Sequence, residues 1–146
     1  MPKSRTPLVI IDSREKAPWK FPLARTTVKC LQSYGYDYTL AGMQNIMGVE
    51  RKSLQDFWHR VSTMRRWDKF CSGQLRKLAK LKHPIIIIEG NITTKLPYLD
   101  ISQEACAERA CEIIASFNIP VLFAGSRKAA QYAAFQFMTK CKNRYS

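Results

Sequence analysis

Four consecutive isoleucines, Ile85–Ile88, constrain the fold of this chain more than any other segment. They lie between Pro84 and Glu89, and successive side chains of a β-strand point to opposite faces of its sheet. An uninterrupted apolar strand therefore needs cover on both faces, which helices provide in α/β proteins. The run predicts a central strand in a sheet that is flanked by helices.

Other segments predict the remaining elements. Apolar runs bounded by turn residues indicate strands at 8–12, 26–31, 37–40, 46–52 and 121–124. Apolar spacing of three and four residues indicates helices after Ser53, from Lys69 to Leu81, after Ser102, and from Ser126 to Lys142. Short links favour an antiparallel meander for the strands at 26–31, 37–40 and 46–52. The 146 residues predict one α/β domain with a mixed sheet flanked by helices.

The charge of the chain points to a polyanionic partner. Lys and Arg total 24 against 11 acidic residues, which gives a net charge of +13. Such an excess on one domain is typical of nucleic-acid binding; the alternative is a solubility surface or a binder without chemistry. No basic amphipathic helix stands apart from the core pattern, which argues against a membrane surface.

Cysteine usage and the N-terminal segment favour an intracellular protein. The five cysteines are odd in number and form no C-x-x-C pair, so we expect reduced thiols. The apolar run Leu8–Ile11 is too short for a signal peptide, and no segment is long enough to span a membrane. The expected location is the cytoplasm of a bacterial host, or the nucleus if the source is eukaryotic.

A Glu-x-Lys pattern ends one of the predicted strands. Glu50 and Lys52 are two residues apart, so on a strand they share one face, whereas Arg51 points to the other. Asp37 opens the preceding strand. Carboxylates on neighbouring strands can bind a divalent cation, and an adjacent ammonium can orient water or stabilise developing charge. The pattern predicts phosphodiester hydrolysis.

Each acidic residue also has a purely structural interpretation. Asp12 closes a buried strand and is suited to capping the turn after it. Asp37 follows a turn, and Asp56 is placed to form a helix cap with Ser53. Glu50 ends an apolar strand and needs a partner, which a neighbouring cation supplies without any metal.

The segment Glu50-Arg51-Lys52-x-x-x-Asp56 resembles the signature of the XPF family of structure-specific endonucleases. The resemblance covers about residues 8–140 and includes three further motifs in the same order: Asp-x-Arg-Glu at 12–15, Asp-Tyr at 37–38 and the strand at 87–90. The chain is most similar to compact bacterial and phage members that consist of the nuclease domain. The resemblance implies a restriction-endonuclease-like core.

The resemblance also implies roles for individual residues. Family members use Mg²⁺ or Mn²⁺ and cut DNA near junctions between duplex and single strand. Asp37 and Glu50 would ligate the metal with help from Asp12, and Lys52 would assist the attacking water. The family commonly dimerises through this domain, so a homodimer is expected.

The same resemblance assigns supporting roles and shows two departures. Arg14 and Arg51 would hold phosphate or stabilise the site, and Asp56 would support the basic pair from the helix. Tyr36 stands where the family has a glycine before the aspartate, which predicts crowding near Asp37. The 146 residues contain no tandem helix-hairpin-helix module, so the family's substrate preference does not transfer.

Six further residues form a candidate nucleic-acid-binding surface: Arg65, Arg66, Trp67, Lys69, Arg76 and Lys80. Arg65, Arg66 and Lys69 would grip backbone phosphates while Trp67 stacks on an unpaired base. The alternative is a core tryptophan surrounded by solvated cations. Arg76 and Lys80 lie one helical turn apart and either extend the basic track or belong to a solvated face.

The sequence therefore predicts a Mg²⁺-dependent DNA endonuclease that acts on branched, flap or fork DNA. Two alternatives stay open. One is a catalytically inactive DNA-binding accessory module of the same fold. The other is a sequence-specific restriction-type endonuclease.

Overall fold

The computed structural model of the protein describes residues 6–145 and contains a single mixed sheet. Its order is β2-β1-β3-β4-β5-β6. The strands are β1 (Leu8–Asp12), β2 (Arg25–Lys29), β3 (Tyr38–Leu40), β4 (Met47–Ser53), β5 (His83–Glu89) and β6 (Val121–Phe123).

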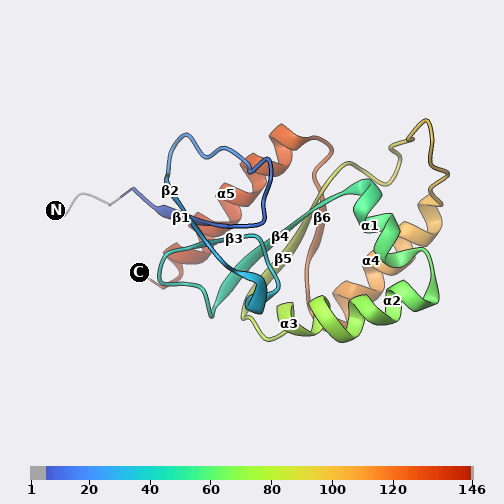
Figure 1. The fold of residues 1–146 in the computed structure, drawn as a ribbon, viewed down its shortest axis with the longest axis horizontal. Coiled ribbons are helices and arrows are strands. Elements are labelled where there is room, and N and C mark those ends of the chain that lie inside the picture. The colour runs from blue at the N-terminus through green and yellow to red at the C-terminus, as the bar shows by residue number, and fades with distance from the viewer. Residues whose placement is uncertain (1–5, 146) are drawn as a thin grey trace.

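Helices cover both faces of this sheet, with α5 on one side and α1, α2 and α4 on the other (Figure 1). The α-helices are α1 (Leu54–Val61), α2 (Met64–Phe70), α3 (Arg76–Leu78), α4 (Gln103–Phe117) and α5 (Arg127–Asn143). A 3₁₀ turn, η1 (Gln32–Tyr34), precedes β3, and a π-helical turn, η2 (Cys71–Leu75), joins α2 to α3. The predicted α/β class with a mixed, helix-flanked sheet is confirmed.

None of the helices within residues 6–145 has the length and apolar character that a membrane span requires. The prediction that no signal peptide is present concerns in part residues 1–5, which lie outside the described residues.

The isoleucine run forms the centre of the sheet, as predicted. Ile85 and Ile87 belong to the apolar core under α5, whereas Ile86 and Ile88 belong to the core under α1, α2 and α4. All four side chains are buried. Strict alternation thus lets one strand contribute to two separate cores.

Strand direction determines where polar side chains gather. β1 runs parallel to β2, and β4 runs parallel to β5, which is parallel to β6. β3 is antiparallel to both β1 and β4. The carboxyl ends of β1, β4 and β5 therefore lie at the same edge as the start of β3. Sites in α/β sheets form at such edges, and Asp12, Asp37, Glu50 and Glu89 all lie there.

The predicted antiparallel meander is wrong for β2. The loop of residues 13–24 is long enough to carry the chain back along β1, so β2 pairs parallel to β1 at the edge of the sheet. β1 then pairs directly with β3. The predicted strand 26–31 is also shifted, since β2 ends at Lys29 and the chain turns into η1.

The helix that was predicted from Lys69 to Leu81 starts and ends earlier in the structure than predicted. It starts at Met64, where the Thr63 hydroxyl accepts a hydrogen bond from the backbone N–H of Arg66, and its last α-helical residue is Leu78. Ser53 and Ser102 cap α1 and α4, as their places before those helices predict, and Ser126 likewise accepts a backbone N–H at the start of α5. Ile114 fits the apolar spacing of α4, yet it is 45% exposed.

The π-helical turn η2 keeps this helix in register with the core. The buried positions are Trp67, Phe70, Leu75 and Leu78, so the middle interval is five residues long, whereas α-helical spacing is three or four. At about 100° per residue, an unbroken α-helix would turn Leu75 away from Phe70. The wider turn accommodates the extra residue and returns Leu75 to the buried face.

Deletion of Gly73 tests this explanation. The deletion shortens the interval from Phe70 to Leu75 to four residues, and glycine has no side chain whose contacts would be lost. We expect an unbroken α-helix and a free energy of unfolding that is unchanged or about 1 kcal/mol higher, since glycine is costly inside a helix. Urea denaturation followed by circular dichroism measures the change.

Deletion of Lys69 is the matched control. It would bring Trp67 and Phe70 to a spacing of two residues, so one of them must leave the core, at a cost of about 2–4 kcal/mol. Equal destabilisation by the two deletions would show that the π-helical turn does not serve to align the apolar face.

Candidate active site

A cavity of about 430 Å³ opens at the edge of the sheet where β1, β3 and β4 meet the helical segment α2–η2–α3. Its interior is lined by Asp12, Asp37, Glu50, Lys52 and Gln74. Four exposed cations line the same cavity: Arg14, Arg60, Lys69 and Lys77. Acidic groups inside a basic rim are suited to a divalent cation and the phosphates around it.

Asp37 lies where the chain breaks its regular alternation. Tyr36 and Tyr38 are two residues apart, yet they pack into opposite cores of the sheet. The irregularity turns the Asp37 carboxylate toward β4, where Oδ2 accepts a hydrogen bond from the backbone N–H of Arg51 (2.9 Å). The backbone N–H of Asp37 donates to the Val49 carbonyl (2.9 Å).

Glu50 and Lys52 share one face of β4, as the two-residue spacing predicts. Lys52 Nζ lies 2.7 Å from Glu50 Oε2, and both residues are only 6% exposed. Lys52 Nζ also donates to Gln74 Oε1 (3.0 Å) and lies 5.2 Å from the centre of the Phe70 ring. An ammonium has three N–H donors, so one is left for a phosphate oxygen or water in the cavity.

The electrostatics of the carboxylates favour a bound cation. Burial raises the pKa of Asp37 far above its usual range, and the negative charge of Glu50 beside it raises that pKa further. Two carboxylates in a poorly solvated place compete for one ammonium, so a second positive charge would stabilise them both.

Asp37 and Glu50 fit a magnesium or manganese ion. Mg²⁺ is commonly held by one or two carboxylates, with substrate phosphates and water completing its ligands. Asp12 lines the same cavity, where its Oδ1 accepts the Leu31 N–H and its Oδ2 accepts Arg14 Nε, both at 2.9 Å; its role as a third ligand stays a prediction. Within residues 6–145, no three His, Cys, Asp or Glu side chains are grouped around one metal position.

Arg51 points to the opposite face of β4 and is held in an ion network. Its Nη1 donates to Glu15 Oε2 (2.9 Å) and to the Ala17 carbonyl (2.7 Å), and its Nε is paired with Glu89. The guanidinium also lies over the buried Trp19 ring at 5.1 Å. Of the two roles implied for Arg51, the structure supports stabilisation of the site, since Nη1 and Nε are engaged by the protein; phosphate binding by Arg51 stays a prediction.

Arg14 and Asp56 lie at the periphery. The Arg14 side chain is 54% exposed and lines the main cavity while it pairs with Asp12. The Asp56 N–H donates to Ser53 Oγ, as the capping interpretation predicts. Its exposed carboxylate lines an adjoining cavity of about 280 Å³, together with Arg51 and Arg60. Asp56 is thus placed beside the basic residues without entering the main cavity.

Tyr36 does not crowd Asp37. Its ring is fully buried and packs over Gly48, where an added Cβ would come within 2.0 Å of the ring. Its hydroxyl donates to the Gln44 carbonyl (2.7 Å), away from the cavity. The large residue before β3 is matched by a glycine on β4, so the predicted crowding is absent.

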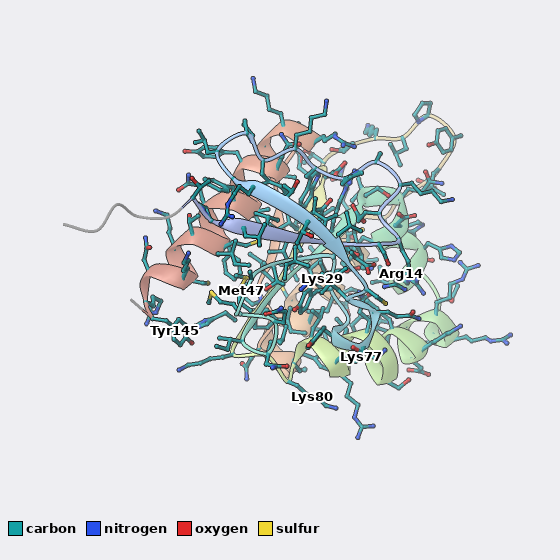
Figure 2. The ribbon with its side chains drawn as sticks, turned by 60° about the vertical axis from the view of Figure 1, so that its left-hand side comes forward. Arg14, Lys29, Met47, Lys77, Lys80 and Tyr145 are labelled. Atoms are coloured by element: carbon teal, nitrogen blue, oxygen red, sulfur yellow. The ribbon has the colours of Figure 1, made fainter. Side chains whose placement is uncertain are left out.

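The predicted nucleic-acid-binding residues separate into two groups. Trp67 is buried and Arg109 lies 4.4 Å above its ring, so it is a core tryptophan and base stacking is excluded. Lys69 lines the cavity. Four residues are exposed but lie outside the cavity lining: Arg65, Arg66, Arg76 and Lys80. Figure 2 shows Arg14 and Lys77 on the same side of the molecule, far from Tyr145.

The lining residues that were not predicted from the sequence include Glu15, Arg60, Gln74 and Lys77. Arg60 follows Asp56 by four residues in the sequence, a spacing that allows an ion pair on one face of a helix. Gln74 and Lys77 reach the cavity because of the π-helical turn, whose signal was the five-residue gap in the apolar pattern.

Comparison with known proteins identifies the family. The family model described as "ERCC4 domain" matches residues 11–134 of the chain. A protein of Methanocaldococcus jannaschii described as a putative ATP-dependent RNA helicase is 29% identical over 115 residues. The match covers 79% of this chain but only 13% of that relative.

Two solved structures share the fold. XPF from Aeropyrum pernix superposes with a TM-score of 0.72 at 18% identity, and its complex with DNA with a TM-score of 0.71 at 20% identity. Each match covers 94% of this chain and 66% of the XPF chain. The expected restriction-endonuclease-like core is therefore confirmed as the fold of the XPF nuclease domain.

Substitution Asp37→Asn should stabilise the metal-free protein. Asparagine keeps an acceptor for the Arg51 N–H and offers a donor to Glu50. Because the pKa of Asp37 is raised in the folded state, its contribution to stability is complete at low pH and is lost as the pH rises above the ordinary value near 4. The variant should therefore exceed wild type by about 1–3 kcal/mol at pH 8, and the difference should disappear near pH 4.

Urea denaturation in chelator at several pH values measures this difference. Asp68→Asn removes an exposed acid on α2 and should change stability by less than about 0.5 kcal/mol. A destabilised Asp37→Asn protein would mean that the two carboxylates do not repel each other in the metal-free state.

Substitution Arg51→Lys should destabilise the fold by about 2–4 kcal/mol, because lysine cannot reach Glu15, Ala17 and Glu89 together and leaves two largely buried acids without a full cationic partner. Thermal and urea unfolding measure the loss. Arg60→Lys, an exposed position nearby, should change stability little. Wild-type stability of Arg51→Lys would show that the network around Arg51 is dispensable.

Proposed function

Because the chain belongs to the ERCC4-domain family and has the XPF nuclease-domain fold, we propose that it is a metal-dependent DNA endonuclease that hydrolyses phosphodiester bonds at branched DNA. The observation that carries this proposal is the convergence of Asp37, Glu50 and Lys52 on one cavity inside a rim of exposed cations. The chain spans 66% of the XPF chains and 13% of the curated relative that it matches, so the activity and the substrate are both proposals.

The chain's own residues divide the chemistry among them. Asp37 and Glu50 would hold Mg²⁺ or Mn²⁺, which when bound supplies an acidic centre that polarises a phosphate and lowers the pKa of water. Lys52 keeps a charged N–H directed into the cavity, where it orients water or stabilises charge that develops on phosphate oxygen. Glu50 holds that ammonium in place through their 2.7 Å contact.

The rim cations would bind the phosphates that flank the scissile bond. Arg14 and Arg60 can form bidentate contacts with phosphate, whereas Lys69 and Lys77 act as point charges. All four are exposed and line the cavity, which suits backbone contacts that carry no sequence information. Arg65, Arg66, Arg76 and Lys80 would extend these contacts along the DNA.

Two alternatives differ in what they predict. An inactive accessory module would bind DNA without cutting it, but it has no reason to retain a buried carboxylate pair whose repulsion costs stability. A restriction-type enzyme would cut plain duplex at fixed sites, whereas the proposed enzyme prefers forks, flaps or splayed ends.

The homodimer expected from the family resemblance stays a prediction, which sedimentation analysis would test.

Incubation with labelled flap, fork, Holliday junction and plain duplex tests the proposal. With Mg²⁺ or Mn²⁺ we expect cleavage near the junctions, and with chelator none. Lys52→Ala and Asp37→Asn should each lower the rate by roughly 100-fold or more, because each removes a group that faces the reacting phosphate.

Lys128→Ala serves as the control, because it removes one cation from α5 on the opposite face of the sheet and should leave the rate unchanged. Binding without cleavage in any metal would favour the accessory module. Cleavage of plain duplex at a fixed sequence would favour the restriction-type alternative.

A further inference from the structure

Gln74 contacts both halves of the candidate active site through the two ends of its side-chain amide. Its Oε1 accepts a hydrogen bond from Lys52 Nζ (3.0 Å), and its Nε2 donates to the backbone carbonyl of Gly35 (2.9 Å). An ammonium only donates and a carbonyl only accepts, so these partners fix the orientation of the amide. A glutamine serves both partners without adding charge to the cavity.

Lys52 needs such a second partner. Its ammonium is a point charge on a flexible four-carbon stem, and a carboxylate alone imposes little direction on it. Glu50 Oε2 contacts Nζ from within the same strand, whereas Gln74 approaches from the helical segment across the cavity. With the Phe70 ring 5.2 Å away, these two acceptors define one position for Nζ.

Gly35 connects Gln74 to the segment that carries Asp37. Gly35 has φ +84°, and an added Cβ would lie 2.9 Å from Lys77 Cβ, so only glycine allows α3 to approach the turn this closely. Asp37 follows two residues later. The Gln74 side chain thus ties the helical segment to the amine and to the start of the acidic segment.

The π-helical turn gives Gln74 its direction. In an unbroken α-helix at about 100° per residue, Gln74 would lie within about 20° of Trp67 on the helix surface, which is the buried face. The wide turn Cys71–Leu75 rotates the chain so that Leu75 takes the buried position and Gln74 moves to the cavity side. π-Helical turns are frequent at functional sites for this reason.

We propose that Gln74 is a positioning residue that fixes the ammonium of Lys52 in the cavity, and that the π-helical turn η2 places it there. The catalytic consequence rests on the proposed function, whereas the placement of the ammonium can be measured without metal or DNA. Gln74 acts through Lys52 and does not itself contact the reacting phosphate.

NMR of lysine ammonium groups tests the placement in the metal-free protein. We expect Lys52 to give a protected ¹H–¹⁵N ammonium signal with restricted Nζ motion, assigned by its loss in Lys52→Arg. Gln74→Met keeps the length of the side chain and removes both hydrogen bonds, so the signal should broaden or disappear. Gln32→Met, on the same cavity but without a contact to Lys52, should leave it unchanged.

Two more variants keep the test decisive. If Gln74→Met fails to fold, Gln74→Ala removes the same bonds with less bulk. Gln74→Glu retains an acceptor for Nζ and should keep the ammonium signal. A folded Gln74→Met or Gln74→Ala protein with wild-type Nζ motion would overturn the proposal, as would loss of the signal in a folded Gln74→Glu protein.

Kinetics provide the second readout. Misplacement of the ammonium should lower kcat roughly 10- to 100-fold in Gln74→Met with little change in KM. A raised KM with wild-type kcat would instead make Gln74 a substrate-binding residue and overturn the proposal. If wild type cuts no DNA, the proposed function fails while the NMR result still decides the role of Gln74.

Discussion

The buried ion pair between Lys52 and Glu50 is the interaction on which the rest of the structure depends. Both ions have lost their hydration, so their attraction stabilises the protein only with good geometry and further hydrogen bonds. Gln74 supplies one of these bonds, while the backbone N–H of Arg51 supports the neighbouring carboxylate of Asp37. Ionisation of the second carboxylate beside Glu50 is costly in this interior, and the exposed cations around it give the rim a positive charge. A metal ion and a phosphate together would neutralise both regions.

Strand β4 separates two tasks that are contiguous in the sequence. Glu50 and Lys52 face the cavity, whereas Arg51 between them faces the loop of residues 13–24 and holds it through Glu15 and the Ala17 carbonyl. That loop follows directly on β1. Alternation along one strand therefore couples the chemistry on one face to the attachment of a loop on the other. It also explains why three consecutive polar residues are tolerated at the end of a buried strand.

Much of this arrangement follows from local patterns. The isoleucine run is sufficient to predict a central strand with two covered faces, and the two-residue spacing of Glu50 and Lys52 is sufficient to place them side by side. Ser53, Ser102 and Ser126 mark helix starts through capping that depends only on neighbouring residues. The parallel pairing of β2 could not be predicted in this way, because it depends on the path of a twelve-residue loop. Nor could the burial of Trp67, since basic neighbours suit a core residue and an exposed one equally.

The least predictable features coincide with the site itself. Asp37 reaches the cavity because Tyr36 and Tyr38 enter opposite cores, and Gln74 reaches it because a π-helical turn interrupts the helix. Regular elements direct side chains with fixed periods, so a residue that must leave the apolar face requires a local departure from that period. Each departure is stabilised by residues outside the site: the Tyr36 ring over Gly48, and Leu75 in the core. Irregular backbone in this protein is therefore a consequence of assembling polar groups against two apolar cores, which places it where the chemistry is expected.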